Sequence, residues 1–262
     1  MSVMSIKFGT LIQVNRIGIL VVAYNAESTI ETTLNRIPTE FVHKIDSILI
    51  SDDNSRDLTS EKASGFAKHS TLPIHVISQP INLGYGGNQK FGYSWAIQND
   101  WDFVVLLHAD GQYAPEFLPQ IIKPLIDNKA EAVFGSRMIN KRSALTGGMP
   151  KYKWIGNQIL TFIQNKLTNQ NLSEWHSGYR AYNVESLKKL NLGSLSNGFR
   201  FDTQIILELL AAKQRIIEIP IPTFYGDEVS HVNGLEYARE IIWDTLRHRV
   251  KHGVSKESSI KK

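Results

Sequence analysis

One run of the sequence, Phe103 to Leu107, consists of apolar residues only. A strand that is apolar on both faces is normally buried on both faces, as in parallel sheets that carry helices on either side. Upstream of this run, short β-branched segments alternate with longer segments of helical spacing. Such alternation is typical of β-α-β units. The sequence therefore predicts an α/β fold, a single Rossmann-like domain around a central, mostly parallel sheet.

The points at which the two patterns change give the expected elements. In the first half we expect strands at Ile17–Ala23, Ile45–Ser51, Ile74–Ser78 and Phe103–Leu107. Helices are expected between them, at Thr29–Ile37, Leu58–Lys68 and Gly87–Ile97. In the second half we expect helices at about 152–167, 202–213 and 236–251, and a strand at 216–221. The chain then divides into an N-terminal extension (1–15), a main domain (16–226), and a C-terminal loop, amphipathic helix and basic tail (227–262).

Composition argues against several classes of protein. The chain has no cysteine, which removes disulfides, thiolate metal sites and cysteine nucleophiles. No apolar stretch approaches the roughly 18 residues that cross a bilayer, and the first residues lack the features of a secretory signal. The net charge of +4 is too small to indicate nucleic-acid binding. We expect a soluble, cytoplasmic protein without a nucleic-acid partner.

Two nucleotide-binding signatures are missing as well. The turn after the first expected strand has no glycine, which the dinucleotide fingerprint needs so that the backbone can approach a pyrophosphate. The Gly-Lys-Ser/Thr ending of a P-loop is also absent. The sequence thus argues against NAD or FAD enzymes and P-loop hydrolases. The Gly84–Gly87 turn could bring backbone close to a phosphate, but an ordinary turn explains it equally well.

Polar residues follow three of the expected strands. In open α/β sheets, ligands bind beyond the carboxyl ends of the strands. These ends are Ala23-Tyr24-Asn25-Ala26-Glu27, Ser51 through Asp57, and His108-Ala109-Asp110-Gly111-Gln112. The second end carries several aspartates, of which one can accept hydrogen bonds from a nucleobase or ribose while another caps the next helix.

The third strand end suggests a metal site. His108, Asp110 and Gln112 alternate, so in an extended continuation of the strand all three side chains would point the same way. A carboxylate, an amide oxygen and an imidazole suit Mg²⁺ or Mn²⁺ with positions left open for phosphate oxygens. A simple turn at Asp110-Gly111 is the alternative.

Together, these strand ends resemble those of the family-two glycosyltransferases, inverting enzymes with a GT-A domain that binds nucleotide-diphospho-sugars. The resemblance covers about Ile17 to Gly226. It rests on Tyr24-Asn25-Ala26-Glu27, Asp52-Asp53-Asn54-Ser55 with Asp57, Ala109-Asp110-Gly111-Gln112, Gly135-Ser136-Arg137, Ser177-Gly178-Tyr179-Arg180-Ala181 and Gly198-Phe199-Arg200-Phe201-Asp202. The later motifs are most similar to dolichyl- or polyprenyl-phosphate mannosyl- and glucosyltransferases. This branch implies a role in cell-envelope or glycan biosynthesis.

The resemblance implies roles for individual residues. The nucleotide sugar, with either a UDP or a GDP moiety, would bind at Ala23, Tyr24, Asn25, Glu27, Asp52, Asp53, Gly84, Asp110 and Lys153. The divalent ion would bind at Asp110 and Gln112. His108 replaces the family's usual first aspartate, and a neutral imidazole can still ligate Mn²⁺. The catalytic set would be Asp110, Arg137, Glu174, His176 and Arg180. The segment Tyr225–His231 stands in place of the family's basic loop.

The acceptor decides whether a catalytic base is needed. A phosphate monoester with a second pKa of about 6 is already largely a dianion at neutral pH, so it needs cations rather than a base. The cationic set Arg137, Lys153, Arg180 and Arg200 favours such an acceptor, a polyprenyl or dolichyl phosphate. The alternative acceptor is a hydroxyl of a glycan or lipid, which requires Glu174 or His176 as base.

Basic residues gather toward the end of the sequence, at Arg247, Arg249, Lys251, Lys256, Lys261 and Lys262. This excess is typical either of a solvated tail or of attraction to anionic headgroups at the inner face of a membrane. The apolar face of the last helix is expected to pack on its own domain.

Two other functions stay open at this point. One is a sugar-nucleotide synthase, although the turn from Tyr24 to Thr29 lacks the glycine-rich, arginine-containing loop expected of that class. The other is a module that binds sugar nucleotides or glycans without catalysis. Release of nucleoside diphosphate would separate this module from an enzyme. The sequence predicts neither the hexose nor the oligomeric state.

Overall fold

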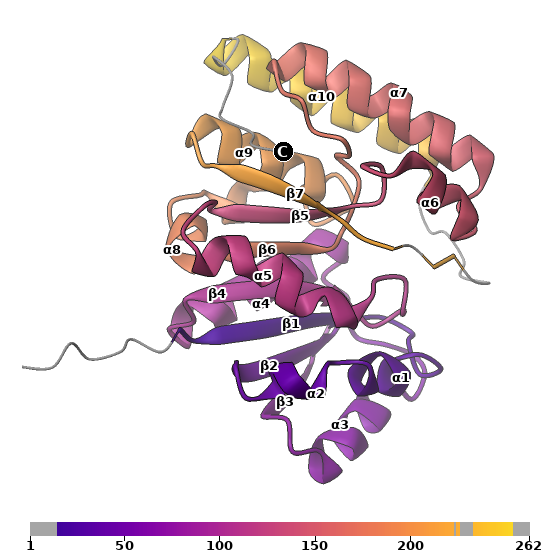
Figure 1. The fold of residues 1–262 in the computed structure, drawn as a ribbon, viewed down its shortest axis with the longest axis vertical. Helices are drawn as coiled ribbons and strands as arrows, with labels where there is room; N and C mark the ends of the chain where they lie inside the picture. Colours follow the sequence, from indigo (N-terminus) through magenta and orange to yellow (C-terminus); the bar gives the residue numbers. More distant parts are fainter. Residues whose placement is uncertain (1–14, 223, 226–232, 254–262) are drawn as a thin grey trace, which may run out of the picture.

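The structure, a computed structural model, describes residues 15–222, 224–225 and 233–253. Seven strands form one sheet in the order β3-β2-β1-β4-β6-β5-β7 (Figure 1). Their bounds are β1 Ile17–Ala23, β2 Ile45–Asp52, β3 Ile74–Ser78, β4 Phe103–His108, β5 Ala132–Ser136, β6 Arg180–Asn183 and β7 Ile216–Pro220. Neighbouring strands are parallel except at β6, which runs antiparallel to both β4 and β5. The predicted α/β fold with a mostly parallel central sheet is confirmed.

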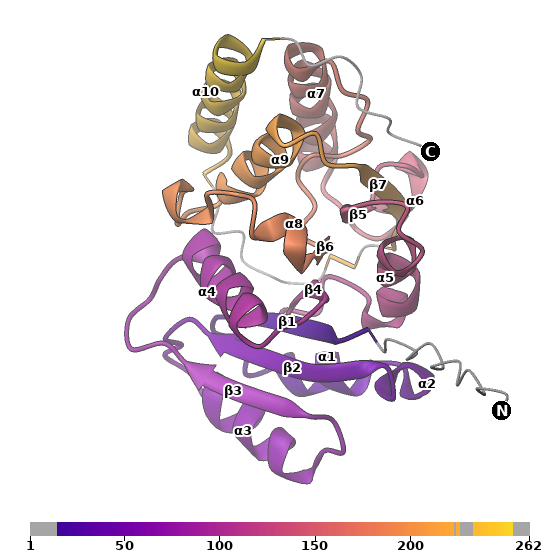
Figure 2. The ribbon, with the colours of Figure 1, turned by 90° about the vertical axis from the view of Figure 1, so that its left-hand side faces the viewer.

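Helices cover both faces of the sheet (Figure 2). One face carries α1 Ile30–Asn35, α2 Thr39–Val42, α3 Thr59–His69 and α5 Leu118–Ile126. The other carries α4 Tyr85–Gln98, α8 Val184–Leu187 and α9 Phe201–Ala211. The remaining elements are α6 Lys141–Thr146, α7 Lys151–Thr168, α10 Gly234–His252 and the short 3₁₀ turns η1 Pro115–Phe117 and η2 Leu192–Ser194.

Strand β4 lies near the middle of the sheet and is buried on both faces, as its composition predicts. Val105 and Leu107 pack into the core beneath α1 and α5, whereas Val104 and Leu106 pack into the core beneath α4 and α9. All four side chains are fully buried. Each contributes about 1.5–3 kcal/mol of transfer free energy. This central strand therefore provides a rigid support for the residues that follow it.

The helices α7 and α10 form the layer farthest from β1 (Figures 1 and 2). They pack against each other, and α10 also packs on α9. Within the described ranges, no helix is both long enough and apolar enough to cross a bilayer.

Candidate active site

The carboxyl ends of β1, β2 and β4 lie side by side, because these three strands are neighbours in the sheet. The ladder continues past the strand ends: the Asp53 amide donates to the Ala23 carbonyl (2.9 Å), and the Ala109 amide donates to the Val22 carbonyl (3.0 Å). Two of these ends are thereby tied to β1, at one edge of the sheet. This is the edge at which ligands of open α/β sheets bind.

The turns after β1 and β2 are hydrogen-bonded to each other. The Asn25 side chain accepts from the amide of Arg56 (2.9 Å), and the Glu27 carboxylate accepts from the amide of Leu58 (3.0 Å) at the start of α3. The side chains of Asn25 and Glu27 thus hold the two turns together. Tyr24, by contrast, is 42% exposed at the mouth of this edge, so its ring is accessible to a ligand.

The two aspartates at the end of β2 are buried and hydrogen-bonded to the protein. Asp52 accepts from the hydroxyls of Ser55 and Ser78. Asp53 accepts from the amides of Leu83 (2.6 Å) and Gly84 (3.0 Å). Burial raises the pKa of Asp53, although these two amide donors oppose the shift. The Asp53 carboxylate therefore anchors the segment that leads into α4.

The glycine turn at the start of α4 is packed against a distant segment. Gly84 has a φ of 79°, and a Cβ there would lie 2.7 Å from the Asn197 carbonyl oxygen. The same oxygen accepts from the amides of Gly86 (2.7 Å) and Gly87 (3.2 Å). Because Gly84 donates to Asp53, the amides of all three glycines of this turn already bond to protein groups. The structure thus agrees with the ordinary-turn interpretation.

Of the two interpretations of the end of β4, an extended continuation or a turn, the structure shows the turn. The strand ends at His108, and the chain turns at residues 109–111. The Asp110 carboxylate accepts from the Gln112 amide (3.0 Å), and Gly111 adopts a φ of 76°. A short Asp side chain that bonds the backbone two residues on favours such a turn over a strand. His108, Asp110 and Gln112 therefore do not form an alternating row.

His108 lies in an aromatic enclosure that sequence reasoning missed. Its ring contacts Tyr113 edge-on (5.1 Å between centroids) and Tyr85 (5.7 Å). A Cβ on Gly178 would lie 2.7 Å from His108 Nε2, so only glycine fits beside the imidazole. Within the described part of the chain, this buried Nε2 has no hydrogen-bond partner.

The donor set fits a divalent ion that takes most of its ligands from a substrate. Asp110 is partly exposed, and no described Lys or Arg forms a salt bridge with it. Across the described residues, no three His, Asp or Glu side chains gather closely enough to hold a metal by themselves. Mg²⁺ is commonly bound by one or two carboxylates together with substrate phosphates. Asp110 suits that mode as the carboxylate ligand.

Arg137 and Glu174 form a buried ion pair. Glu174 accepts from the backbone amide of Arg137 (2.7 Å), from its Nε (2.9 Å) and from its Nη2. Asn157 on α7 donates to the same carboxylate (2.7 Å). Burial acts to raise the pKa of Glu174, but the Arg137 charge and these donors outweigh it and hold the pKa below its usual value.

Arg180 is also enclosed. Its guanidinium donates to the carbonyls of Ser177 (2.8 Å), Asp202 (2.8 Å) and Trp175 (3.2 Å), and it lies 4.9 Å from the Phe134 ring centre. The Arg180 side chain is 1% exposed. The sequence assigns Arg137 and Arg180 to the cations that favour a phosphate acceptor, but the structure uses most of their donors within the protein.

Asp202 connects this enclosed arginine to the aromatic residues around His108. Its carboxylate accepts from the Tyr85 hydroxyl (2.8 Å) and lies 3.6 Å from Arg180 Nη1. Tyr85 in turn stacks on Phe199 (5.1 Å). Asp202 and Phe199 belong to a motif that the sequence indicated. Nothing in the sequence predicted a role for Tyr85 beyond its place in the glycine turn.

His176 is enclosed and neutral. Its Nδ1 lies 3.0 Å from the Tyr237 hydroxyl of α10. Burial lowers the pKa of His176 to about 4. Its Nε2 is buried without a hydrogen-bond partner among the residues that the structure describes.

Two members of the expected cationic set stay partly exposed. Lys153 Nζ lies 5.5 Å from the ring centre of Tyr225, whose hydroxyl accepts from Arg137 Nη1 (3.1 Å). Arg200 Nη1 lies 3.7 Å from Asp244 on α10. The predicted segment Tyr225–His231 lies outside the described residues except for Tyr225 itself.

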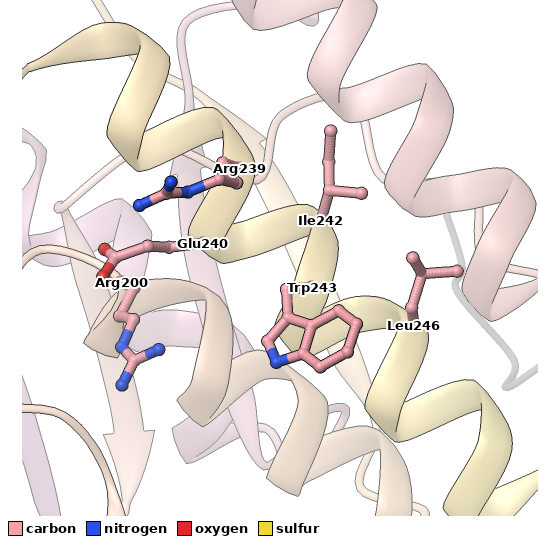
Figure 3. A pocket seen from close by; sticks show the side chains of 6 residues that line it. All are labelled: Arg200, Arg239, Glu240, Ile242, Trp243 and Leu246. Carbon is pink, nitrogen blue, oxygen red and sulfur yellow. The ribbon is translucent and has the colours of Figure 1, made fainter.

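Arg200 borders an open depression of about 630 Å³ on the surface of α10 (Figure 3). Its lining combines charged and apolar side chains, namely Arg200, Arg239, Glu240, Ile242, Trp243 and Leu246. The charged groups lie toward one side and Ile242 and Leu246 toward the other (Figure 3).

Comparison with known proteins gives a consistent result. The family profile described as "Glycosyl transferase family 2" matches residues 18–190. A UDP-N-acetylglucosamine–dolichyl-phosphate N-acetylglucosaminyltransferase of Methanococcus voltae is 29% identical over 222 residues, which are 80% of this chain and 86% of that protein. An undecaprenyl-phosphate mannosyltransferase of Micrococcus luteus is 26% identical over 250 residues, which are 90% of this chain and 99% of that protein.

Among solved structures, glucosyl-3-phosphoglycerate synthase from Mycobacterium tuberculosis, in complex with Mn²⁺, UDP and glucosyl-3-phosphoglycerate, superposes with a TM-score of 0.67. The likeness covers 92% of this chain and 81% of that chain, at 17% sequence identity. At this identity the likeness concerns the fold, and the predicted GT-A architecture is confirmed.

Proposed function

The chain belongs to glycosyltransferase family 2, and from this premise we propose that it transfers a hexose from a nucleotide-diphospho-sugar to a polyprenyl or dolichyl phosphate, with inversion. The relatives from Methanococcus voltae and Micrococcus luteus are named for transfer to dolichyl and undecaprenyl phosphate, which supports this acceptor. The residues of this chain support it independently, through the state of the two candidate bases.

The state of Glu174 carries the proposal. A hydroxyl acceptor needs a base that can take a proton in the transition state. The Glu174 carboxylate accepts three hydrogen bonds from Arg137 and one from Asn157, and its pKa is held below the usual value. A carboxylate held in this way is a poor proton acceptor, because protonation would leave Arg137 buried without its partner.

His176 is a weak alternative base. A catalytic base works best when its pKa lies near the operating pH. The pKa of His176 is about 4, so its imidazole is neutral at pH 7 but has little affinity for a proton. A phosphate acceptor avoids this difficulty, because it arrives as a dianion.

In the proposed reaction, an acceptor phosphate oxygen attacks the anomeric carbon as the bond from that carbon to the nucleoside diphosphate breaks. The nucleoside diphosphate leaves with the bonding electron pair, and no proton is removed from the acceptor. Asp110 would hold a divalent ion, which when bound neutralises charge on the departing diphosphate. Tyr24 would contact the nucleoside, while Asn25, Glu27, Asp52 and Asp53 shape the edge that receives it.

Cations near α7 would bind the acceptor phosphate. Lys153 is partly exposed and is linked to Arg137 through Tyr225. Lysine binds phosphate as a mobile point charge, so its side chain can move from the Tyr225 ring to an arriving phosphate. We assign Lys153 to acceptor binding and the Arg137–Glu174 pair to holding this part of the site in place.

The proposal is tested by offering UDP- and GDP-sugars, with Mg²⁺ or Mn²⁺, together with either a polyprenyl phosphate or the matching polyprenol. Glycolipid product is measured by mass spectrometry. We expect product from the polyprenyl phosphate and at least about 10²-fold less from the polyprenol, because the polyprenol requires a base. Preferential transfer to the polyprenol would overturn the acceptor assignment and would favour His176 as a base.

A further inference from the structure

Helix α7 is amphipathic, but its polar side is buried and its apolar side is exposed. Its buried positions are polar, namely Asn157, Thr161, Gln164 and Thr168. Its exposed positions include Tyr152, Ile155, Ile159 and Phe162, which are 72%, 50%, 54% and 62% exposed. A surface helix of a globular protein normally turns its apolar stripe toward the core. In α7 the apolar stripe instead faces outward.

Polar contacts hold α7 in this orientation. Asn157 donates to Glu174 (2.7 Å), and Gln164 Nε2 lies within hydrogen-bond distance of Thr203 on α9 (3.3 Å) and Thr245 on α10 (3.5 Å). Rotating the helix to bury its apolar stripe would break these bonds and would expose the ion pair of Glu174. The outward stripe is therefore built into the fold.

Helix α10 carries a second outward-facing apolar stripe. Its buried positions, Ile241, Thr245 and His248, face the neighbouring helices. On its outer side, Trp243, Leu246 and Val250 are 54%, 38% and 87% exposed. The outer helical face is defined here as Tyr152, Ile155, Ile159 and Phe162 of α7 with Trp243, Leu246 and Val250 of α10. In both views the two helices form the outermost layer beyond α9 (Figures 1 and 2).

Basic residues border this face. Helix α7 contains Lys151, Lys153 and Lys166 and no acidic residue. Lys166 Nζ lies 5.6 Å from the Phe162 ring centre, and the Arg247 guanidinium lies 5.1 Å from the Trp243 ring centre. Long basic side chains that lie along apolar surface can extend their charges toward a polar boundary while their stems stay on the apolar side.

We propose that the outer helical face lies on the surface of a membrane that contains anionic lipids. The apolar side chains would enter the boundary between headgroups and acyl chains, with Tyr152 and Trp243 at the level that aromatic residues prefer. The basic border would face lipid phosphates. The depression in Figure 3 adds Arg200 and Arg239, together with one carboxylate, Glu240, beside Trp243.

A second copy of the chain fits this face less well. A symmetric dimer would place the same patch on both subunits. Where α7 packed against the α7 of the partner, its lysines would approach each other with no acidic residue on that helix to balance them. An anionic bilayer offers both the apolar layer and the opposite charge.

The test is flotation of the full chain with vesicles of equal parts phosphatidylglycerol and phosphatidylcholine, without donor or acceptor. We expect the wild-type protein to float with these vesicles and to bind pure phosphatidylcholine vesicles at least tenfold less. The variant Ile155→Gln/Ile159→Gln/Phe162→Gln should lose at least tenfold of its binding to the mixed vesicles. Lys151→Gln/Lys166→Gln should weaken binding mainly at low salt. This test uses neither substrate, so its outcome is separate from that of the proposed reaction.

The matched control is Leu58→Gln/Ile81→Gln, which removes exposed apolar side chains elsewhere on the molecule. This control should float like the wild type. Thermal unfolding of the triple variant should match the wild type, because its altered side chains are exposed. Equal loss of flotation in the control, equal binding to both vesicle types, or a wild-type dimer that the triple variant converts to monomer would each overturn the proposal.

Discussion

At the scale of single residues, the site separates carboxylates that hold the protein together from a carboxylate left for a ligand. Asp53 and Glu174 are buried, and their oxygens accept hydrogen bonds from backbone or side chains. Asp110 is partly exposed, and its one described bond is local, from the Gln112 amide. The sequence presents all of these as acidic residues near strand or loop ends, but their surroundings give them different roles.

Asp110→Asn should abolish most activity and leave the fold intact. An asparagine oxygen can still accept from the Gln112 amide, so the turn survives, but the charge that binds a divalent ion is lost. A metal contributes several kcal/mol to stabilising transition-state charge, which corresponds to a loss on the order of 10³-fold in kcat/KM. Initial rates of glycolipid formation and thermal unfolding measure the two effects.

The control for this variant is Asp127→Asn. Asp127 forms surface ion pairs with Lys123 and Lys129, and exposed pairs of this kind contribute little to stability. The control should keep full activity. Activity of Asp110→Asn that returns to the wild-type level with added Mn²⁺ would contradict the role given to Asp110.

Glu174→Gln should destabilise the protein more than it slows the reaction. The substitution leaves the Arg137 guanidinium buried without its counter-charge, which costs about 3–5 kcal/mol. Thermal or denaturant unfolding measures this cost. Because the pKa of Glu174 is lowered in the folded state, its stabilisation is present above the unfolded pKa of about 4.3 and is lost as pH falls through the lower folded pKa. The difference between variant and wild type should therefore shrink in acid.

Glu185→Gln is the matched control for that variant. Glu185 is exposed and pairs with Lys188 on the surface, so its replacement should change stability by less than about 1 kcal/mol. If Glu174→Gln instead remained as stable as the wild type but lost about 10³-fold in rate, Glu174 would be a base and the hydroxyl acceptor would be favoured.

At the scale of elements, the close approach of α4 to β1 depends on a glycine. A Cβ on Gly92 would lie 2.2 Å from Leu20 Cδ2, which is fully buried in β1. Gly92→Ala should therefore cost about 1–3 kcal/mol, as overpacking of a core commonly does. Because α4 begins at the glycine turn beside Asp53, a shift of this helix should also weaken nucleotide-sugar binding. Chemical denaturation and calorimetry with the donor measure both effects.

Gly65 provides the control, since it is a helical glycine with open space around it. Apart from Gly65, its chain neighbours and the backbone of its own helix, no atom of the described residues lies within 4 Å of a Cβ added at Gly65 in α3. Gly65→Ala should stabilise the protein by up to about 1 kcal/mol, because alanine has the higher helix propensity. Equal destabilisation by both variants would contradict the role given to the contact with Leu20, because helix propensity alone favours alanine at both positions.

The pattern of short apolar runs and helical spacings was sufficient to predict β1 to β4 and the helices α1, α3 and α4, but not the four-residue helix α2. It could not predict β6, because Arg180–Asn183 is short and begins with a charged residue. Arg180 is tolerated there only because Asp202, Ser177 and Trp175 supply its partners. Periodicity predicted the position of α7, but only the contacts of Asn157 and Gln164 determine which side of that helix is buried.

The candidate site was predictable in its location but not in the bonding of its residues. Strand ends indicate which edge of the sheet matters, and this needs only local sequence. The partners of Arg137 and Tyr85 lie 37 and 117 positions away along the chain, in segments that the fold alone brings together. After β4 the chain can either stay extended or turn through a hydrogen bond between Asp110 and the Gln112 amide. The spacing of His108, Asp110 and Gln112 does not predict which of the two forms.

At the scale of the whole molecule, α7 connects the two proposals. Through Asn157 it contacts the Glu174–Arg137 pair, through Lys153 it reaches Tyr225, and its other side presents the outer helical face. A helix bound at a membrane surface in this way would hold the acceptor-binding cations near the depth of lipid phosphates. The enzyme would then meet its acceptor in two dimensions rather than by diffusion from water.

Transfer to a long-chain polyprenyl phosphate in anionic vesicles should accordingly fall with salt, whereas transfer to a short-chain analogue in water should change much less. Between 0.1 M and 1 M salt the Debye length falls from about 10 Å to about 3 Å, which weakens attraction of the basic border to headgroups. We expect KM for the vesicle acceptor to rise about tenfold or more while kcat stays nearly constant. The triple α7 variant should show a raised KM on vesicles already at low salt and wild-type kinetics with the short-chain analogue. Equal salt sensitivity for both acceptors would place the effect in the site itself and would separate catalysis from membrane contact.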